Sequence, residues 1–534
     1  MRNSTILLPS IYRAKILART IKTQRSPDWP TALQAELPGR DVCDRLVYHY
    51  FRTVETLYRI LHIPTFRKDY EAIWVDGPTP STGFMVQFRL VLAIGAISYD
   101  ENCSLRADAT RWICEAQTWT SNPSSKSRLG LEYLQINILL LLARELVDIG
   151  SEMVWITAGS LLREAIYIGL HKDPSQLPRL NQLDCELRRR IWNTILEINL
   201  QFSLIAGGPC LISLEDFNTK PPANFEDEVL GLPDTAPAPE HILTSTSLAI
   251  ALRKTLPVRL QVVKFLNDIA TTGTYEETLR LDADVRAAHK TLRHTFQKFW
   301  LGKPGGATST FAAEAAEFIM QRYISSLHVP YFNPSLHDAV YAFSRKAVLD
   351  TSLKIWYLAC PTPQSLSDRS DLLDGKETDM TRLCRCGAGF FRAFTFHAST
   401  FLTAELRAQY QEDDTIPRPD LLQIPQEAAD LVLRCLEAGE TGIKGYLLLR
   451  VFGAQIDGIK RRLGKDEMMS VLGKAAEDAV SHCLPLLERI AGVSETSAAD
   501  NIDAVDFDFQ VSPDFLEDWD LVMSDVFNFE AIST

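Results

Sequence analysis

The sequence has 534 residues, of which 46% are hydrophobic and 23% charged, and its formal net charge is −13. These proportions exclude an intrinsically disordered polymer and a fibrous repeat, and the length allows one large hydrophobic core or several. The acidic balance also argues against a chain whose whole surface binds nucleic acid.

The first 27 residues contain six basic side chains and no acidic one: Arg2, Arg13, Lys15, Arg19, Lys22 and Arg25. This pattern resembles a mitochondrial presequence, but a basic linker or nuclear-import segment is the favoured interpretation. We assign residues 1–36 to a basic N-terminal linker. The most apolar run, residues 138–143, is far shorter than the roughly 20 residues of a membrane-spanning helix, so we expect no membrane partner.

Apolar side chains recur with helical spacing along most of the chain. Three stripes show this spacing: Leu46, Tyr50, Val54, Leu57 and Leu61; Trp155, Ala158, Gly159, Leu162, Ile166 and Gly169; and Leu187, Ile191, Ile195, Ile198, Phe202 and Ile205. Pro64 is expected to end the first stripe, and Gly207 with Gly208 the third. Because no series of alternating strand-like segments occurs, we predict an all-α fold, a multi-helical bundle or irregular helical array.

Segments rich in Pro, Gly, Ser and Asp divide this helical chain at residues 221–239 and 303–309, with a weaker break at 361–381. We therefore predict a first helical block over residues 37–300 and a second over residues 310–492. The remaining residues, 493–534, form a separate tail.

The tail is acidic and aromatic. Residues 500–534 contain ten Asp or Glu and no Lys or Arg, and six aromatic side chains lie among them. This mixture is associated with activation domains, and carboxylate repulsion favours a disordered or partly helical state. After a helix start at Ser512, four apolar residues share one face that suits a coactivator groove: Phe515, Trp519, Val522 and Val526. The alternative is that this face packs onto the chain's own helical body.

Motifs for catalysis and metal binding are incomplete. No nucleophile elbow, phosphate loop or dinucleotide fingerprint is present, so we predict no catalytic, cofactor-binding or metal-binding residues and no enzymatic activity. Cys384 and Cys386 lack a second cysteine pair and are interpreted as buried thiols. His62, His171 and His328 end apolar helical stretches, a position that suits capping or core hydrogen bonds. The Arg188–Arg190 triplet is interpreted as structural, with at least one internal pair and the others solvated.

Several segments together resemble the fungal-specific transcription factor domain, the regulatory middle region of fungal zinc-binuclear-cluster activators. They are "YRILHIPTFRKDYEAIW" at 58–74, "WITAGSLLREAIYIGLHKDP" at 155–174, "ELRRRIWNTILEINLQFSLIAGGPCLISLEDFNTKPPAN" at 186–224, "SLHVPYF" at 326–332 and "FSRKAVLD" at 343–350. The resemblance covers residues 37–492. Asn193, Asn199 and Gly208 depart from it, since the common pattern has Trp, Asp and Arg there.

The resemblance implies a nuclear transcription regulator, consistent with control of a metabolic or secondary-metabolite gene cluster. It also implies transcriptional coactivators as partners and a possible homo- or heterodimer. Family members usually carry six clustered cysteines that hold two zinc ions beside a DNA-reading helix, whereas Cys43 is the only cysteine before residue 100 here. We therefore expect no cofactor in this chain, with zinc only if such a cluster precedes it, and DNA contact that is indirect or made through that missing domain. The alternatives are a non-DNA-binding dimerisation partner of a complete relative, or an all-α ligand-binding protein or enzyme.

Overall fold

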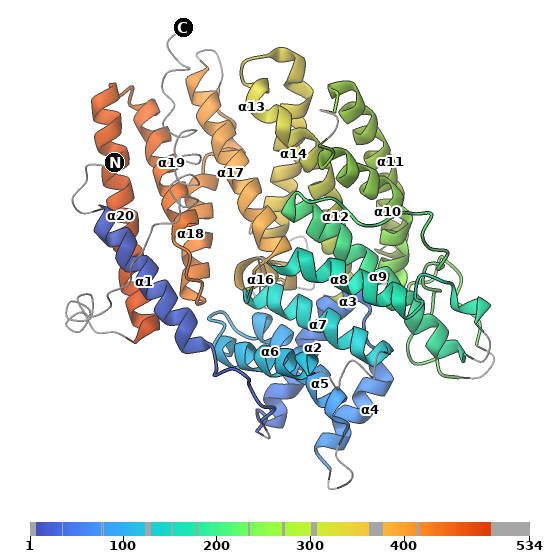
Figure 1. Cartoon of the computed structure of the whole chain (residues 1–534). Coiled ribbons are helices and arrows are strands. Elements are labelled where there is room, and N and C mark those ends of the chain that lie inside the picture. The colour runs from blue at the N-terminus through green and yellow to red at the C-terminus, as the bar shows by residue number, and fades with distance from the viewer. Residues whose placement is uncertain are drawn as a thin grey trace. The chain divides into compact units, whose positions relative to one another are not determined.

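The structure, a computed structural model, describes residues 7–34, 36–75, 77, 80–122, 130–150, 153–177, 180–232, 235–269, 273–300, 307–361, 377–412 and 416–492. Every regular element in these ranges is a helix, which confirms the predicted all-α class (Figure 1). The tail predicted at 493–534 lies outside the described residues, and with it the candidate coactivator-binding residues Phe515, Trp519, Val522 and Val526.

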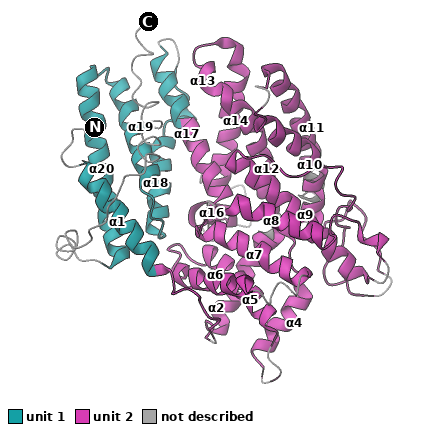
Figure 2. Cartoon of the chain, in the orientation of Figure 1, with its two compact units in different colours: residues 1–24, 403–534 teal, residues 25–402 magenta. Residues whose placement is uncertain are grey.

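The chain divides into two compact units, residues 1–24 with 403–534 and residues 25–402 (Figure 2). We call them unit 1 and unit 2. The sequence-based division into blocks 37–300 and 310–492 follows linker composition instead of contacts, and it stays a prediction.

Unit 2 is built from helices only within its described part. They are α2 (Arg40–Arg52), α3 (Val54–Tyr58), α4 (Ile63–Ile73), α5 (Thr82–Gly95), α6 (Arg106–Ser121), α7 (Leu131–Val147), α8 (Val154–Tyr167), α9 (Gln182–Ala206), α10 (Ser247–Leu266), α11 (Tyr275–Trp300), α12 (Ala307–His328), α13 (Phe332–Ser335), α14 (Ala342–Ala359), α16 (Asp379–Cys386) and α17 (Phe390–Gln411) through residue 402, with short 3-10 turns η1 (Ala96–Ser98), η4 (Pro174–Gln176), η5 (Val329–Tyr331) and η6 (Ala339–Tyr341).

The core of unit 2 lies around α5, α7 and α9. Almost every side chain of α5 from Phe84 to Gly95 is buried, and α7 is nearly as enclosed, as expected for helices that are apolar on all sides. α5 packs against α2, α6 and α7, while α9 packs against α7, α8 and α10. A Cβ at Gly95 would overlap the backbone of Leu46, so the glycine allows α2 and α5 to approach closely.

The first apolar stripe is buried as predicted, but it does not form one helix. Thr53, at φ −111° and ψ −88°, separates α2 from α3. Pro64 lies in the first turn of α4 and does not end a helix, because that turn needs no N–H from it. The stripe does end before Pro64 as predicted, but α3 ends at Tyr58 with Arg59 in the left-handed conformation, so the proline is not the cause.

The other two stripes agree with the prediction except at their ends. In α9, Ile191, Ile195 and Ile198 are fully buried, and the helix ends at Gly207 in the left-handed conformation with φ 63°. Ile205, in the last turn, is 40% exposed. In α8, Ala158 and Leu162 are buried, but Ile166 is 38% exposed and Gly169 lies beyond the helix end.

Unit 1 contains α1 (Leu7–Arg25), the end of α17, the 3-10 turn η8 (Pro419–Leu421), α18 (Ile424–Glu437), α19 (Lys444–Lys460) and α20 (Lys465–Ala491). α19 packs against both α18 and α20. Arg13 of α1 pairs with Glu488 at 2.6 Å, and Gln24 donates a hydrogen bond to the Ala491 carbonyl at 3.1 Å. Residues 7–25 of the predicted linker therefore form a helix held to α20.

Candidate functional site

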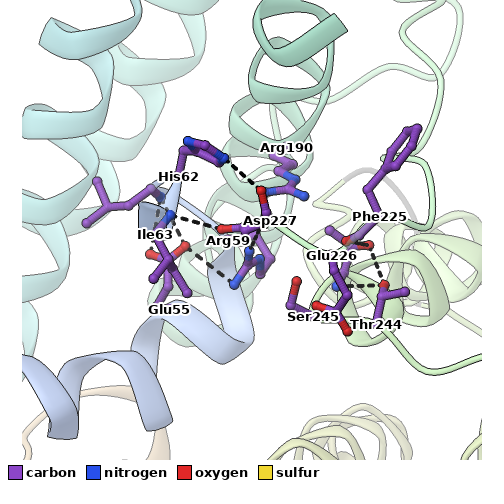
Figure 3. Close-up of polar contacts among 12 residues, drawn as sticks. Glu55, Arg59, His62, Ile63, Arg190, Phe225, Glu226, Asp227, Thr244 and Ser245 are labelled. Atoms are coloured by element: carbon purple, nitrogen blue, oxygen red, sulfur yellow. Dashed lines mark hydrogen bonds and ion pairs between the residues drawn. The ribbon is translucent and has the colours of Figure 1, made fainter. Parts of the chain in front are cut away.

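The predicted break at residues 221–239 contains a buried carboxylate. Asp227 lies in the irregular segment between α9 and α10 and is only 2% exposed. Its Oδ1 accepts hydrogen bonds from Arg59 at 2.5 Å and Arg190 at 2.7 Å, and its Oδ2 accepts one from the Ile63 N–H at 3.0 Å (Figure 3). Burial raises the pKa of Asp227, but the two guanidinium groups outweigh it and lower the pKa to about 2.

Backbone geometry places Arg59 in this cluster. Arg59 ends α3 in the left-handed region, at φ 47° and ψ 59°, which only a few per cent of non-glycine residues adopt. Glu55, one turn earlier, has an oxygen 3.8 Å from the Arg59 guanidinium and accepts hydrogen bonds from the Tyr50 hydroxyl and the Leu61 N–H. Burial raises the pKa of Glu55 to about 7 despite these partners.

His62 connects the same cluster to the start of α4. Its Nδ1 is 2.7 Å from the Thr65 hydroxyl, and its Nε2 is 3.0 Å from the Asp227 carbonyl oxygen. His328 is likewise enclosed, between Ser344 and Asp282. These contacts confirm the predicted hydrogen-bonding role of the two residues. The Nδ1 of His171 makes no hydrogen bond.

All three arginines of the α9 triplet are held inside unit 2. Arg188 donates to the Ile168 carbonyl at 3.1 Å, Arg189 pairs with Asp173 at 2.9 Å and with Glu186 at 2.5 Å, and Arg190 binds Asp227. The structural interpretation is confirmed, since all three have internal partners, and Arg188 and Arg189 are half-buried whereas Arg190 is fully buried. Together with the Arg59–Asp227 pair, these contacts connect three of the five segments that carry the family resemblance, at 58–74, 155–174 and 186–224.

Asn224 organises the segment next to Asp227. Its Nδ2 donates to the carbonyl oxygens of Ala238, Pro239 and Ile242 at 2.9 to 3.2 Å. Its Oδ1 accepts hydrogen bonds from the Thr244 hydroxyl at 2.7 Å and the Ser247 hydroxyl at 3.2 Å. One buried amide thus closes residues 224–244 into a loop against the start of α10.

This loop forms one wall of a groove of about 380 Å³ whose other walls are α10 and α11. Its lining mixes polar and apolar side chains: Asn224, Glu240, His241, Ser247, Ile250, Ala251, Lys254, Thr255, Ala288, Thr291, Leu292, His294 and Thr295. Lys254 and Glu240 pair at 3.2 Å across two of the walls. The volume lies within the range of about 300–1,000 Å³ typical of small-molecule sites.

The groove offers binding groups without an evident reaction centre. Its threonine hydroxyls and imidazoles can orient a ligand, and its aliphatic residues can bury apolar surface. Within the described ranges, no group of three or more His, Cys, Asp or Glu side chains could hold a metal ion.

Cys384 and Cys386 are 1% and 0% exposed, which confirms the prediction of buried thiols.

Sequence reasoning did not identify Asp227, Asn224 or Glu55. Asp227 lies in a Pro-rich segment with no periodic pattern, and its partners are remote in sequence. The motif at 58–74 did include Arg59 and His62, and the motif at 186–224 ended on Asn224. The family resemblance was therefore the available signal that these segments carry functional residues.

Among the described helices, none combines the length and apolar character that crossing a membrane requires.

Comparison with known proteins gives one family. Residues 47–269 match the fungal specific transcription factor domain, a range that includes the Asp227 cluster and the α10 side of the groove. The chain is 31% identical to the transcription factor opdR of Penicillium oxalicum, over 95% of this chain and 66% of that protein. It is 31% identical to the transcription factor lepE of Aspergillus flavus, over 87% of this chain and 57% of that protein.

A third relative, the aspyridones cluster regulator apdR of Emericella nidulans, is 26% identical over 82% of this chain and 60% of that protein. The chain therefore spans between 57% and 66% of the length of these three curated relatives.

Proposed function

Because this chain belongs to the family that carries the fungal specific transcription factor domain, we propose that it is a fungal transcription regulator that controls a secondary-metabolite gene cluster. The observation that carries this proposal is the similarity to named transcription factors over 95% and 87% of the chain. A relative named as the regulator of the aspyridones cluster supports the class of target. A regulator of this kind acts in the nucleus.

In this proposal the tail and unit 2 have different tasks. The tail, residues 493–534, binds transcriptional coactivators through Phe515, Trp519, Val522 and Val526. Unit 2 binds a small-molecule effector in the groove beside Asn224, whose volume and mixed lining support that use. The ion pairs of Asp227 hold the segment that forms one groove wall.

A reporter assay tests the regulatory role. The full chain, fused to an unrelated DNA-binding domain, should activate a reporter gene, and truncation after residue 492 should remove that activity. Replacing Phe515 and Trp519 together by Ala should abolish most of it, because aromatic anchors at binding surfaces commonly contribute about 2 kcal/mol or more each. The matched control, Asp518→Asn with Asp520→Asn, should have a smaller effect, since exposed charges mainly steer association.

Two results would contradict this assignment. One is a silent fusion of the full chain and of residues 500–534 alone. The other is a larger loss from the Asn pair than from the Ala pair. Either result favours the alternative that the tail packs onto the chain's own body.

The route to DNA is tested separately. The purified chain should form no sequence-specific complex in a gel-shift assay at about 150 mM salt, because specific readout needs a groove-entering element with several phosphate contacts. A sequence-selective complex formed by this chain alone would show that one of its helices reads DNA directly.

A further inference from the structure

Two cysteine side chains meet inside unit 2. Cys103 lies in the connection between η1 and α6, and Cys386 is the last residue of α16; they are 4% and 0% exposed. The two thiols hydrogen bond to each other. Cys103 Sγ also lies 3.8 Å from the carbonyl oxygen of Ile97 in η1, and Cys386 Sγ lies 4.0 Å from that of Asp100 in the connection.

The backbone on both sides holds the sulfurs together. Cys103 has φ 48°, a left-handed conformation that is unfavourable for a non-glycine residue and persists only where the surroundings impose it. Arg106, at the start of α6, donates to the Cys386 carbonyl at 3.0 Å and reaches the Val147 carbonyl at 3.5 Å. This arginine fixes the end of α16 beside the connection that carries Cys103.

The two thiols have different electrostatic surroundings. The hydrogen bond from Cys103, followed by the charges of Arg385 and Arg392, lowers the pKa of Cys386 although burial opposes it. The same hydrogen bond and burial raise the pKa of Cys103. A thiolate is the nucleophilic form of cysteine, so the pair contains one activated sulfur and one protonated neighbour. By contrast, burial raises the pKa of both Cys43 and Cys483 to about 12.

We propose that Cys103 and Cys386 are a thiol–disulfide site that closes into an intrachain disulfide when it reacts with a hydroperoxide. The Cys386 thiolate attacks one peroxide oxygen and the O–O bond breaks, which gives a sulfenic acid and an alkoxide that takes up a proton as the alcohol. The Cys103 sulfur then attacks the Cys386 sulfur, the S–OH bond breaks, and the hydroxide leaves with the Cys103 proton as water. Two thiols lose two electrons, and the hydroperoxide is reduced by two.

The disulfide joins α16 covalently to the connection between α5 and α6. It replaces the hydrogen bond between the two side chains, and neither sulfur of the disulfide carries a proton that could be donated to the Ile97 or Asp100 carbonyl. Because both sulfurs are buried, peroxide reaches them only when this region opens locally. The frequency of that opening therefore sets the oxidation rate. The proposal adds a covalent state to unit 2 and does not depend on the gene target or on the tail.

The test uses the reduced, purified full chain. After exposure to hydrogen peroxide at neutral pH, free thiols are blocked with N-ethylmaleimide, and non-reduced peptides are analysed by mass spectrometry. The Cys103–Cys386 disulfide should be the main cross-link and should disappear after treatment with dithiothreitol. Cys386→Ser should abolish the cross-link. Cys103→Ser should trap a sulfenic acid on Cys386, which dimedone labels.

Cys384→Ser is the matched control, since Cys384 lies on the same helix, is 1% exposed and should leave the cross-link unchanged. Complete alkylation of both thiols after peroxide treatment would overturn the proposal. So would a main cross-link that involves Cys384. The wild-type measurement needs no substitution and decides the question even if a variant folds poorly.

Discussion

Replacing Asp227 by Asn should destabilise unit 2 by between about 2 and 5 kcal/mol. The amide keeps the size of the side chain but removes the charge that faces Arg59 at 2.5 Å and Arg190 at 2.7 Å, both almost completely buried. Breaking a buried ion pair by removing one partner costs about 3–5 kcal/mol, because the other charge stays in the interior. Here two guanidinium groups would remain side by side.

The pKa of Asp227 gives the lower bound. Its fall from 3.8 to about 2 corresponds to roughly 2.4 kcal/mol, at 1.36 kcal/mol per unit. That figure compares the ionised with the protonated carboxyl group and omits the unpaired arginines, so it is smaller than the cost of the substitution. Since the pKa is lowered, this stabilisation is complete above pH 3.8 and is lost as the pH falls towards 2.

Urea denaturation of the full chain, followed by circular dichroism and tryptophan fluorescence, measures the effect. Asp420→Asn is a matched control, because Asp420 pairs with Arg418 at 2.6 Å on the surface of unit 1, where such pairs contribute about 0–1 kcal/mol. Adding Arg190→Met to Asp227→Asn should recover part of the loss, since it removes one of the unpaired charges. Equal midpoints for the two Asn variants would refute the reasoning.

Three further predictions test separate features. Ile195→Asp puts a carboxylate at a fully buried position of α9 and should cost several kcal/mol; an unchanged melting temperature would show that the assigned helix face is wrong. Burial raises the pKa of Glu145 to about 7, so this residue alone should cost the wild-type chain about 3 kcal/mol as the pH rises from 4.5 to above 7. Glu55, whose pKa is also about 7, adds to the pH dependence of every variant that retains it. Melting curves of Glu145→Gln at pH 5 and pH 8 should therefore differ less than those of the wild type. A Cβ at Gly208 would overlap the Trp155 ring, so Gly208→Ala should lower the melting temperature. Gly473 lies in α20 with open space around it, so Gly473→Ala should raise the melting temperature through a gain of about 1 kcal/mol in helix propensity. The same direction of change for both glycines would contradict the packing argument.

The sequence was sufficient for the fold class and for the buried centre of α9, because helical periodicity records directly which face meets the core. Ile191, Ile195 and Ile198 are fully buried where the period places them. The break at Thr53 could not be predicted, since the apolar stripe continues through it without a change of spacing. The exposure of Ile166 and Ile205, near the ends of α8 and α9, was also missed, because an apolar residue in a last turn is exposed when no neighbouring element covers it.

The candidate site was less predictable, for a physical reason. A buried charge depends on partners brought from distant parts of the chain, and Asp227 meets Arg59 and Arg190 only in the folded state. The Arg188–Arg190 triplet was correctly interpreted as structural, yet its partners could not be assigned from spacing alone. The departure at Gly208, noted as a difference from the common pattern, now has a structural reason in the ring of Trp155.

The three-residue distance between Asn224 and Asp227 has a thermodynamic consequence. Asn224 holds the groove wall, and Asp227 holds the junction of α3, α4 and α9, so both ends of this short segment are fixed by hydrogen bonds. A ligand that binds one position of the groove wall more tightly than another also changes the stability of the Asp227 contacts. The coupling energy between the wall and those contacts sets the size of this change. By reciprocity, the factor by which Asp227→Asn changes the affinity of that ligand equals the factor by which the ligand changes the equilibrium cost of the substitution, although Asp227 does not line the groove.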